Sequence, residues 1–97
     1  MNIKIGGYGR YASGNYGVNA IRVDIGNITF YFSYQTCVAI HTYEHGLNVH
    51  ENVWGPTTGK HLNWIDDGDK KSRLSSIEFD AKMVEILNHY NLEMPRT

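Results

Sequence analysis

Hydrophobic and polar residues alternate along two neighbouring stretches of the chain, residues 20–25 and 28–33. A period of two places alternate side chains on one face of a β-strand. The dipeptide Gly26-Asn27 between the stretches is typical of a two-residue hairpin turn of type I′ or II′. This turn pairs the apolar residues and gathers them on one face of the hairpin. The expected pairs are Ile25 with Ile28, Val23 with Phe30 and Ile21 with Phe32.

Further strands are predicted on both sides of this hairpin. Residues 1–17 are rich in glycine and tyrosine and predict short strands interrupted by a turn at Ser13-Gly14-Asn15. Residues 37–43 are apolar on both faces, as in a central strand. A turn that ends at Gly46, in the left-handed conformation, leads to an alternating stretch at 47–54. Together these stretches predict an antiparallel meander of four to five strands.

The last regular pattern, over residues 75–90, is helical. Ser75 and Glu78 have the spacing of a capping box at its start. Apolar residues then recur every three or four positions and form one stripe. The stripe comprises Phe79, Met83, Ile86, Leu87 and Tyr90, with Val84 at its edge and Asn91 suited to cap the end.

The predicted fold class is therefore α+β, a single domain over residues 1–97. An antiparallel sheet carries one C-terminal α-helix, about 75–90, packed on one face. We expect four side chains from the hairpin and the helix to share one core. They are Phe30, Phe32, Phe79 and Ile86.

Between the sheet and this helix, residues 55–74 show no sustained period. Such a long segment without an element is uncommon in a small domain, so we expect a functional loop or a short helix. Leu62, Trp64 and Ile65 are expected to hold the segment to the core. Asp66-Asp67-Gly68-Asp69 lacks the alternating oxygen ligands and the distal Glu of a calcium loop, and it predicts a solvated turn.

Composition and charge narrow the classes of function. Nine Lys and Arg against ten Asp and Glu give a net charge of −1, which disfavours a basic nucleic-acid coating protein and an acidic DNA mimic. The single Cys37 excludes an internal disulfide and fits a reducing cytosol. No apolar signal core follows Met1, and no run reaches membrane-spanning length. We expect a cytoplasmic protein without a membrane partner.

The sequence contains incomplete versions of several catalytic motifs. The stretch Gly55 to His61 has three residues between its glycines instead of the four of a phosphate-binding loop, and His61 replaces the hydroxyl residue. Cys37 and His41 lie four residues apart on a strand, about 13 Å, too far for a nucleophile–base pair. We therefore expect no catalytic residues and no cofactor, so the protein is predicted not to be an enzyme.

Three histidines, His41, His45 and His50, raise the question of a metal site. Depending on the turn, His41 lies opposite His50 or opposite Val49 on the next strand, and the sequence leaves this register open. Structural zinc usually takes four ligands, commonly with thiolates. The expectation is that no metal is bound.

The glycine-rich segment has the composition of antibody-like binding loops, because tyrosine gives a large contact area at low entropic cost. The competing explanation is that its tyrosines pack half-buried beside the helix. A second group of aromatic and charged residues follows the last strand, where Trp54 has a core alternative too. The expected partner-binding residues are Tyr8, Arg10, Tyr11, Tyr16, Trp54, Lys60 and His61.

Residues 9–17, 28–34 and 52–63 together resemble a family of small proteins carried by bacteriophages and other mobile elements. The resemblance spans roughly residues 8–80, and its most specific part is the stretch Trp-Gly-x-Thr-Thr-Gly-Lys-His-Leu-Asn from Trp54. The resemblance supplies no catalytic residues that could be assigned to positions of this chain. It implies a context, since small phage proteins often disarm host defences by binding, and anti-CRISPR proteins are the best-populated class.

We therefore expect a phage-encoded, non-enzymatic inhibitor that binds a CRISPR–Cas effector in the host bacterial cytoplasm. One alternative is a phage regulatory protein that binds nucleic acid. Another is a small metal-dependent enzyme. The residues leave the target and the oligomeric state open.

Salt-dependent binding to DNA separates the first two possibilities. A protein that tracks phosphates releases counterions and loses affinity steeply as salt rises. With a net charge of −1, we expect no duplex binding tighter than about 10 µM near physiological salt, weaker than typical specific sites. Fluorescence anisotropy with a labelled duplex measures this. Submicromolar binding that weakens with salt would favour the regulatory protein.

Overall fold

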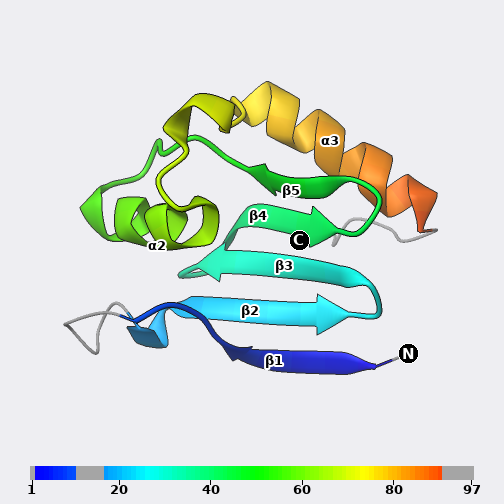
Figure 1. Cartoon of the computed structure of the whole chain (residues 1–97), viewed down its shortest axis with the longest axis horizontal. Helices are drawn as coiled ribbons and strands as arrows, with labels where there is room; N and C mark the ends of the chain where they lie inside the picture. The colour runs from blue at the N-terminus through cyan, green and yellow to red at the C-terminus, as the bar shows by residue number, and fades with distance from the viewer. Residues whose placement is uncertain (1, 11–16, 91–97) are drawn as a thin grey trace.

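The computed structural model describes residues 2–10 and 17–90. Five strands form one antiparallel sheet in chain order, and two helices follow (Figure 1). The predicted α+β meander is confirmed, with a second helix added. The strands are β1 Ile3–Gly7, β2 Ala20–Ile25, β3 Ile28–Ser33, β4 Thr36–Thr42 and β5 Gly46–Val49; the helices are α2 Pro56–Asp66 and α3 Ser76–His89, with a 3-10 turn at Lys70–Ser72 between them.

The β2–β3 hairpin has the predicted turn and register. Its apolar cross-strand pairs are those expected, Ile25 with Ile28, Val23 with Phe30 and Ile21 with Phe32. Gly26 has a φ of 57°, which its missing Cβ allows without strain.

Strand β4 is buried on both faces, as its sequence predicts. A bulge interrupts its pairing with β3, because Phe32 pairs with Cys37 while Tyr31 pairs with Ala39, which leaves Val38 as the extra residue. Val38 and Ala39 therefore both join the core under α2, while Ile40 joins the core under α3.

The sheet thus has two core clusters, one beneath each helix. Beneath α3, Ile28 and Ile40 pack against the predicted helical stripe of Phe79, Met83, Ile86 and Leu87, and Phe30 and Tyr90 pack on the edge. Beneath α2, Val38, Ala39 and Val49 pack against Leu62. Phe32 was expected in the α3 core but is half-buried outside it, on the Cys37 side of the bulge.

Helix α3 begins with the predicted capping box. The Ser75 hydroxyl accepts a hydrogen bond from the amide of Glu78, and the Glu78 carboxylate accepts one from the amide of Ser75. Tyr90 occupies the C-cap, and the expected cap Asn91 lies outside the described residues. Within the described chain, neither helix has the length and apolar character needed to cross a bilayer.

The segment without a sustained period contains α2, so of the two expected alternatives the short helix is confirmed. Pro56 stands at the helix start, where its missing amide proton is not needed, but Gly59 in the interior and the weak apolar stripe conceal the helix in the sequence. Leu62 is buried and Ile65 half-buried, as expected, whereas Trp64 is exposed.

The acidic turn after α2 is only partly solvated. Arg73 donates to both carboxylate oxygens of Asp66, at 2.7 and 3.0 Å, and both side chains are nearly fully buried. The solvated-turn prediction is therefore wrong for Asp66, because a partner seven residues away compensates its charge.

Strand β5 ends earlier than the alternating pattern suggests, and its register decides the question that the sequence left open. Thr42 pairs with Gly46, whose φ of 70° confirms the left-handed turn, so His41 lies opposite Leu47 rather than His50 or Val49. A three-residue loop, Tyr43 to His45, closes the hairpin, so the partner of His41 lies two residues before Val49 and three before His50. At the other end of the chain, the predicted turn at residues 13–15 lies outside the described residues.

The α3 core supplies a stability test with two positions on one helix. Ile86→Ala removes buried methylenes and leaves a cavity, so we expect a loss of about 2–5 kcal/mol in the free energy of unfolding. Val84→Ala, at the exposed edge of the same helix, should cost less than about 0.5 kcal/mol. Chemical denaturation measures both. Equal small losses would contradict the packing of α3 on the sheet.

Candidate functional site

The seven predicted partner-binding residues do not form one surface. Arg10, Trp54 and Lys60 are exposed, whereas Tyr8 and His61 are buried. Tyr11 and Tyr16 lie outside the described residues. Two of the five described candidates therefore lie in the interior. Trp54 is the one aromatic candidate among the described residues that is exposed at the surface.

Tyr8 is a core residue at the end of β1. Only 5% of it is exposed, and its hydroxyl donates a 2.9 Å hydrogen bond to the carbonyl oxygen of Phe32. Its ring contacts Tyr31 edge-on at a centroid distance of 5.3 Å and Trp64 at 5.4 Å. Tyr8 thus joins β1 to β3 and α2, which matches the competing explanation of a packed tyrosine, with α2 instead of the C-terminal helix as its neighbour.

His61 belongs to a buried cluster of three polar side chains, which we call the hydroxyl–imidazole cluster. It consists of Ser33 at the end of β3 and Thr58 and His61 on α2, one helical turn apart. Ser33 Oγ lies 2.8 Å from Thr58 Oγ1 and 2.7 Å from His61 Nδ1. Because buried polar groups need partners, these bonds fix the position of α2 against the sheet.

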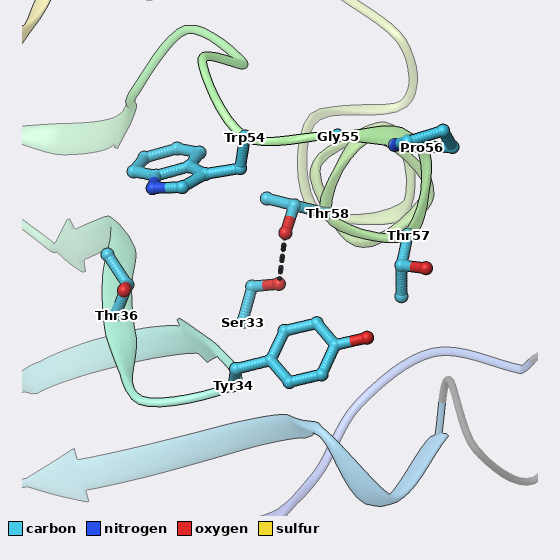
Figure 2. A pocket seen from close by; sticks show the side chains of 8 residues that line it. All are labelled: Ser33, Tyr34, Thr36, Trp54, Gly55, Pro56, Thr57 and Thr58. Atoms are coloured by element: carbon cyan, nitrogen blue, oxygen red, sulfur yellow. Dashed lines mark hydrogen bonds between the residues drawn. The ribbon is translucent and has the colours of Figure 1, made fainter.

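A hollow opens at the surface beside this cluster. It has a volume of about 320 Å³ and lies between the β3–β4 turn and the start of α2. In Figure 2, Trp54 and Tyr34 lie on opposite sides of the Ser33–Thr58 hydrogen bond. The hollow is lined by Ser33, Tyr34, Thr36, Trp54, Gly55, Pro56, Thr57 and Thr58.

Tyr34 occupies a strained position at the rim of the hollow. It has a φ of 58°, in the left-handed region where a bulky side chain costs about 1–3 kcal/mol. The two-residue turn after Ser33 would accept a glycine there without this strain. Tyr34 is nevertheless 48% exposed, with its ring 6.2 Å from that of His61 between centroids, and Trp54 across the hollow is 42% exposed. The backbone therefore holds an aromatic ring in contact with solvent at an energetic cost.

The Ser33–His61 contact has the distance of a nucleophile–base pair, but it lies in the interior. Ser33 Oγ is shared with Thr58, and all three side chains are almost fully buried. Burial also raises the pKa of the Cys37 thiol to about 12, partly offset by hydrogen bonds from the backbone, so this cysteine stays protonated at neutral pH.

None of the remaining described histidines lines the hollow, although the His50 ring contacts that of Trp54 at a centroid distance of 4.7 Å. His50 Nδ1 lies 2.6 Å from the carbonyl oxygen of Glu51, which can only accept, so Nδ1 carries a proton. The other nitrogen, Nε2, lies 3.0 Å from Ser76 Oγ and links the end of β5 to the start of α3. Across residues 2–10 and 17–90, no three His, Cys, Asp or Glu side chains gather as ligands of one metal ion would.

Three residues of the hollow, Ser33, Tyr34 and Thr58, were not predicted from the sequence as site residues. A signal existed for Thr58, since Thr58 and His61 are three residues apart and share one face of a helix. This spacing is informative only if residues 56–66 are known to form a helix, and the sequence pattern conceals α2. Ser33 is 28 residues from His61, so no local pattern connects them.

The hydroxyl–imidazole cluster supplies a second stability test. Ser33→Ala leaves the Thr58 hydroxyl and His61 Nδ1 without this buried partner, so we expect a loss of about 1–3 kcal/mol in the free energy of unfolding. The matched control is Ser72→Ala, at an exposed residue of the 3-10 turn, which should change stability by less than about 0.5 kcal/mol. Urea unfolding of both variants measures the difference. Equal stabilities would show that the cluster does not hold α2 in place.

No curated protein and no solved structure matches the chain. A family model does match, described as a family of unknown function (DUF8033), over residues 3–81. The matched region contains all five strands, α2, the hydroxyl–imidazole cluster and the hollow with its two exposed rings. The chain therefore belongs to the DUF8033 family.

Proposed function

We propose that the protein is a non-enzymatic binding protein whose partner, another protein, docks at the hollow between Tyr34 and Trp54. The observation that carries the proposal is the strained φ of Tyr34 at the exposed rim. Strained residues persist where the surrounding structure holds them, and they concentrate at ligand and partner sites. A buried tyrosine would offset this strain through core packing, but Tyr34 is about half exposed.

The residues around the hollow suit a protein partner. Tyrosine and tryptophan are the side chains most enriched among the residues that dominate binding energy in protein interfaces. Thr36 and Thr57 also line the hollow, and their hydroxyl groups can hydrogen-bond a partner. The volume of about 320 Å³ is at the lower end of ligand pockets and accommodates a partner's side chain.

Arg10 and Lys60 keep their proposed place in the interface as charged residues outside the hollow. Both are exposed, and charges at an interface rim act mainly on the rate and specificity of association. Charge reversal, Arg10→Glu or Lys60→Glu, would therefore weaken binding less than loss of an aromatic ring.

The partner class rests on the resemblance to small phage proteins and on no contact within the fold. We propose a CRISPR–Cas effector as the partner and the host bacterial cytoplasm as the compartment. A nucleic-acid-binding phage regulator is the alternative.

Removal of the exposed rings tests the proposal. Tyr34→Gly deletes the ring and removes the strain of the positive φ, because glycine adopts this conformation freely. Trp54→Ala deletes the second ring. We expect each variant to keep its unfolding free energy within about 1 kcal/mol. We expect each to lose about 30-fold in affinity for the partner, the effect of a binding residue worth about 2 kcal/mol. The matched control is Tyr43→Gly, because Tyr43 is exposed in the turn before β5, away from the hollow.

Two measurements are made on the parent protein and on each of the three variants. The first is phage plaque formation on bacteria with active CRISPR–Cas immunity, where the parent and Tyr43→Gly should restore plaques and the two ring variants should not. The second is capture of a protein from host lysate, followed by titration of the captured protein. Equal capture by parent and ring variants would overturn the hollow as the interface. Capture through the hollow without restored plaques would instead overturn the CRISPR–Cas target and retain the binding function.

A further inference from the structure

Strand β1 forms an open edge of the sheet. It lies at one end of the strand order, on the side away from α3 (Figure 1). Its five residues pair with β2 in an unbroken register. No other strand in the described part of the chain pairs with its outer side. An open edge of this kind is a template for pairing with another strand.

The direction of the backbone groups follows from two hydrogen bonds at the ends of β1. The amide of Gly26 donates to the carbonyl oxygen of Asn2 at 3.1 Å, and the amide of Tyr8 donates to the carbonyl oxygen of Ala20 at 3.2 Å. Alternate residues of an antiparallel strand bond to the same neighbour. The even-numbered residues of β1 therefore bond to β2, and Ile3, Ile5 and Gly7 direct their amides and carbonyls outward.

The two isoleucines among these residues present apolar side chains that neither helix covers. Ile3, Ile5 and Gly7 pair with Ile25, Val23 and Ile21, on the sheet face that carries the α3 core. Ile5 is 73% exposed and Ile3 is exposed to a similar degree. An apolar stripe beside unpaired backbone is the combination that natural edge strands usually suppress with prolines, bulges or several charges. Lys4 is the one charged residue of β1.

The opposite edge of the sheet is already partly closed. Leu74 forms a bridge with His50 just beyond β5, its amide donates to the carbonyl oxygen of Val49, and its carbonyl accepts from the amide of Glu51. The sheet is therefore open for further pairing chiefly at β1.

We propose that two copies of the chain pair antiparallel through β1, with a two-fold axis at Ile5, to form one ten-stranded sheet. In this register Ile5 lies opposite Ile5 of the second copy, and Ile3 lies opposite Gly7. The outward-directed backbone groups of both strands then meet in hydrogen-bonded pairs. The apolar stripes of the two copies become continuous on one face of the sheet.

The other registers that match the backbone groups are less favourable. A shift of two residues in one direction brings Lys4 opposite Lys4 of the second copy, and like charges directly opposite are destabilising. A shift in the other direction leaves only Ile5 to Gly7 paired. In the proposed register Lys4 faces Gly6, where a side chain at Cβ would meet no atom of its own chain within 4 Å. The open space beside Gly6 accommodates the Lys4 side chain of the second copy.

Sedimentation velocity of the full chain tests the dimer. Five paired residues give an interface at the small end of the size range, so we expect a monomer–dimer equilibrium between about 1 µM and 1 mM, the span of weak affinities. Ile5→Glu places two carboxylates opposite each other and should weaken dimerisation at least tenfold. The matched control is Ile77→Glu, at a position 83% exposed on α3, which should dimerise like the parent.

Three outcomes of this experiment would overturn the proposal. They are a parent that stays monomeric over the whole range, an Ile5→Glu variant that dimerises like the parent, and an Ile77→Glu variant that dissociates as Ile5→Glu does. Circular dichroism of each protein at the lowest concentration verifies that the monomers fold, so loss of dimer is distinguishable from loss of structure.

Cysteine cross-linking tests the register. A residue on the two-fold axis lies about 5.5 Å from its copy between Cα atoms, within the range of a disulfide. Residues two positions away from the axis are roughly 13 Å from their copies. Under mild oxidation, Ile5→Cys should give a covalent dimer and Ile3→Cys should not, with the parent as the control for Cys37. Cross-linking through Ile3→Cys alone, or through neither variant, would overturn this pairing of β1.

Discussion

The burial of β4 on both faces is the constraint on which the rest of the fold depends. Val38, Ala39 and Ile40 are completely buried, and their strand supplies both core clusters. A strand with two apolar faces requires a covering layer on each side of the sheet. One helix satisfies one face only, so the chain forms α2 as well as α3. The bulge at Val38 lets two consecutive side chains contribute to the α2 cluster.

Placement of α2 creates the candidate site. The helix must lie close to the end of β3 to cover Val38 and Ala39, and there its polar face meets Ser33. The buried hydroxyl–imidazole cluster compensates the polar groups that this contact removes from water. The start of α2 and the β3–β4 turn then stand on either side of an open hollow with Tyr34 and Trp54 at its rim (Figure 2).

The same arrangement leaves β1 exposed. Both core clusters draw their sheet residues from β3, β4 and β5, so the apolar side chains of β1 extend beyond the helices. Tyr8 holds the end of β1 against β3 and α2, but no comparable contact covers Ile3 or Ile5. Partner binding at the hollow and pairing at the β1 edge would thus use separate surfaces.

The sequence by itself determined the local structure: the β2–β3 register, the left-handed Gly46, the two-faced β4 strand and the capping box of α3 each depend on residues a few positions apart. It also singled out Trp54 and His61, though not their different environments. Only the tertiary structure decided that Tyr8 and His61 are buried, that Asp66 pairs with Arg73, and that Ser33 meets α2. The contacts of Tyr8, His61 and Ser33 join segments distant in the sequence, and the Asp66–Arg73 pair, seven residues apart, depends on how the chain folds back after α2. Local periodicity carries no information about such contacts, because burial is set by the element that packs above a residue and not by its neighbours along the chain.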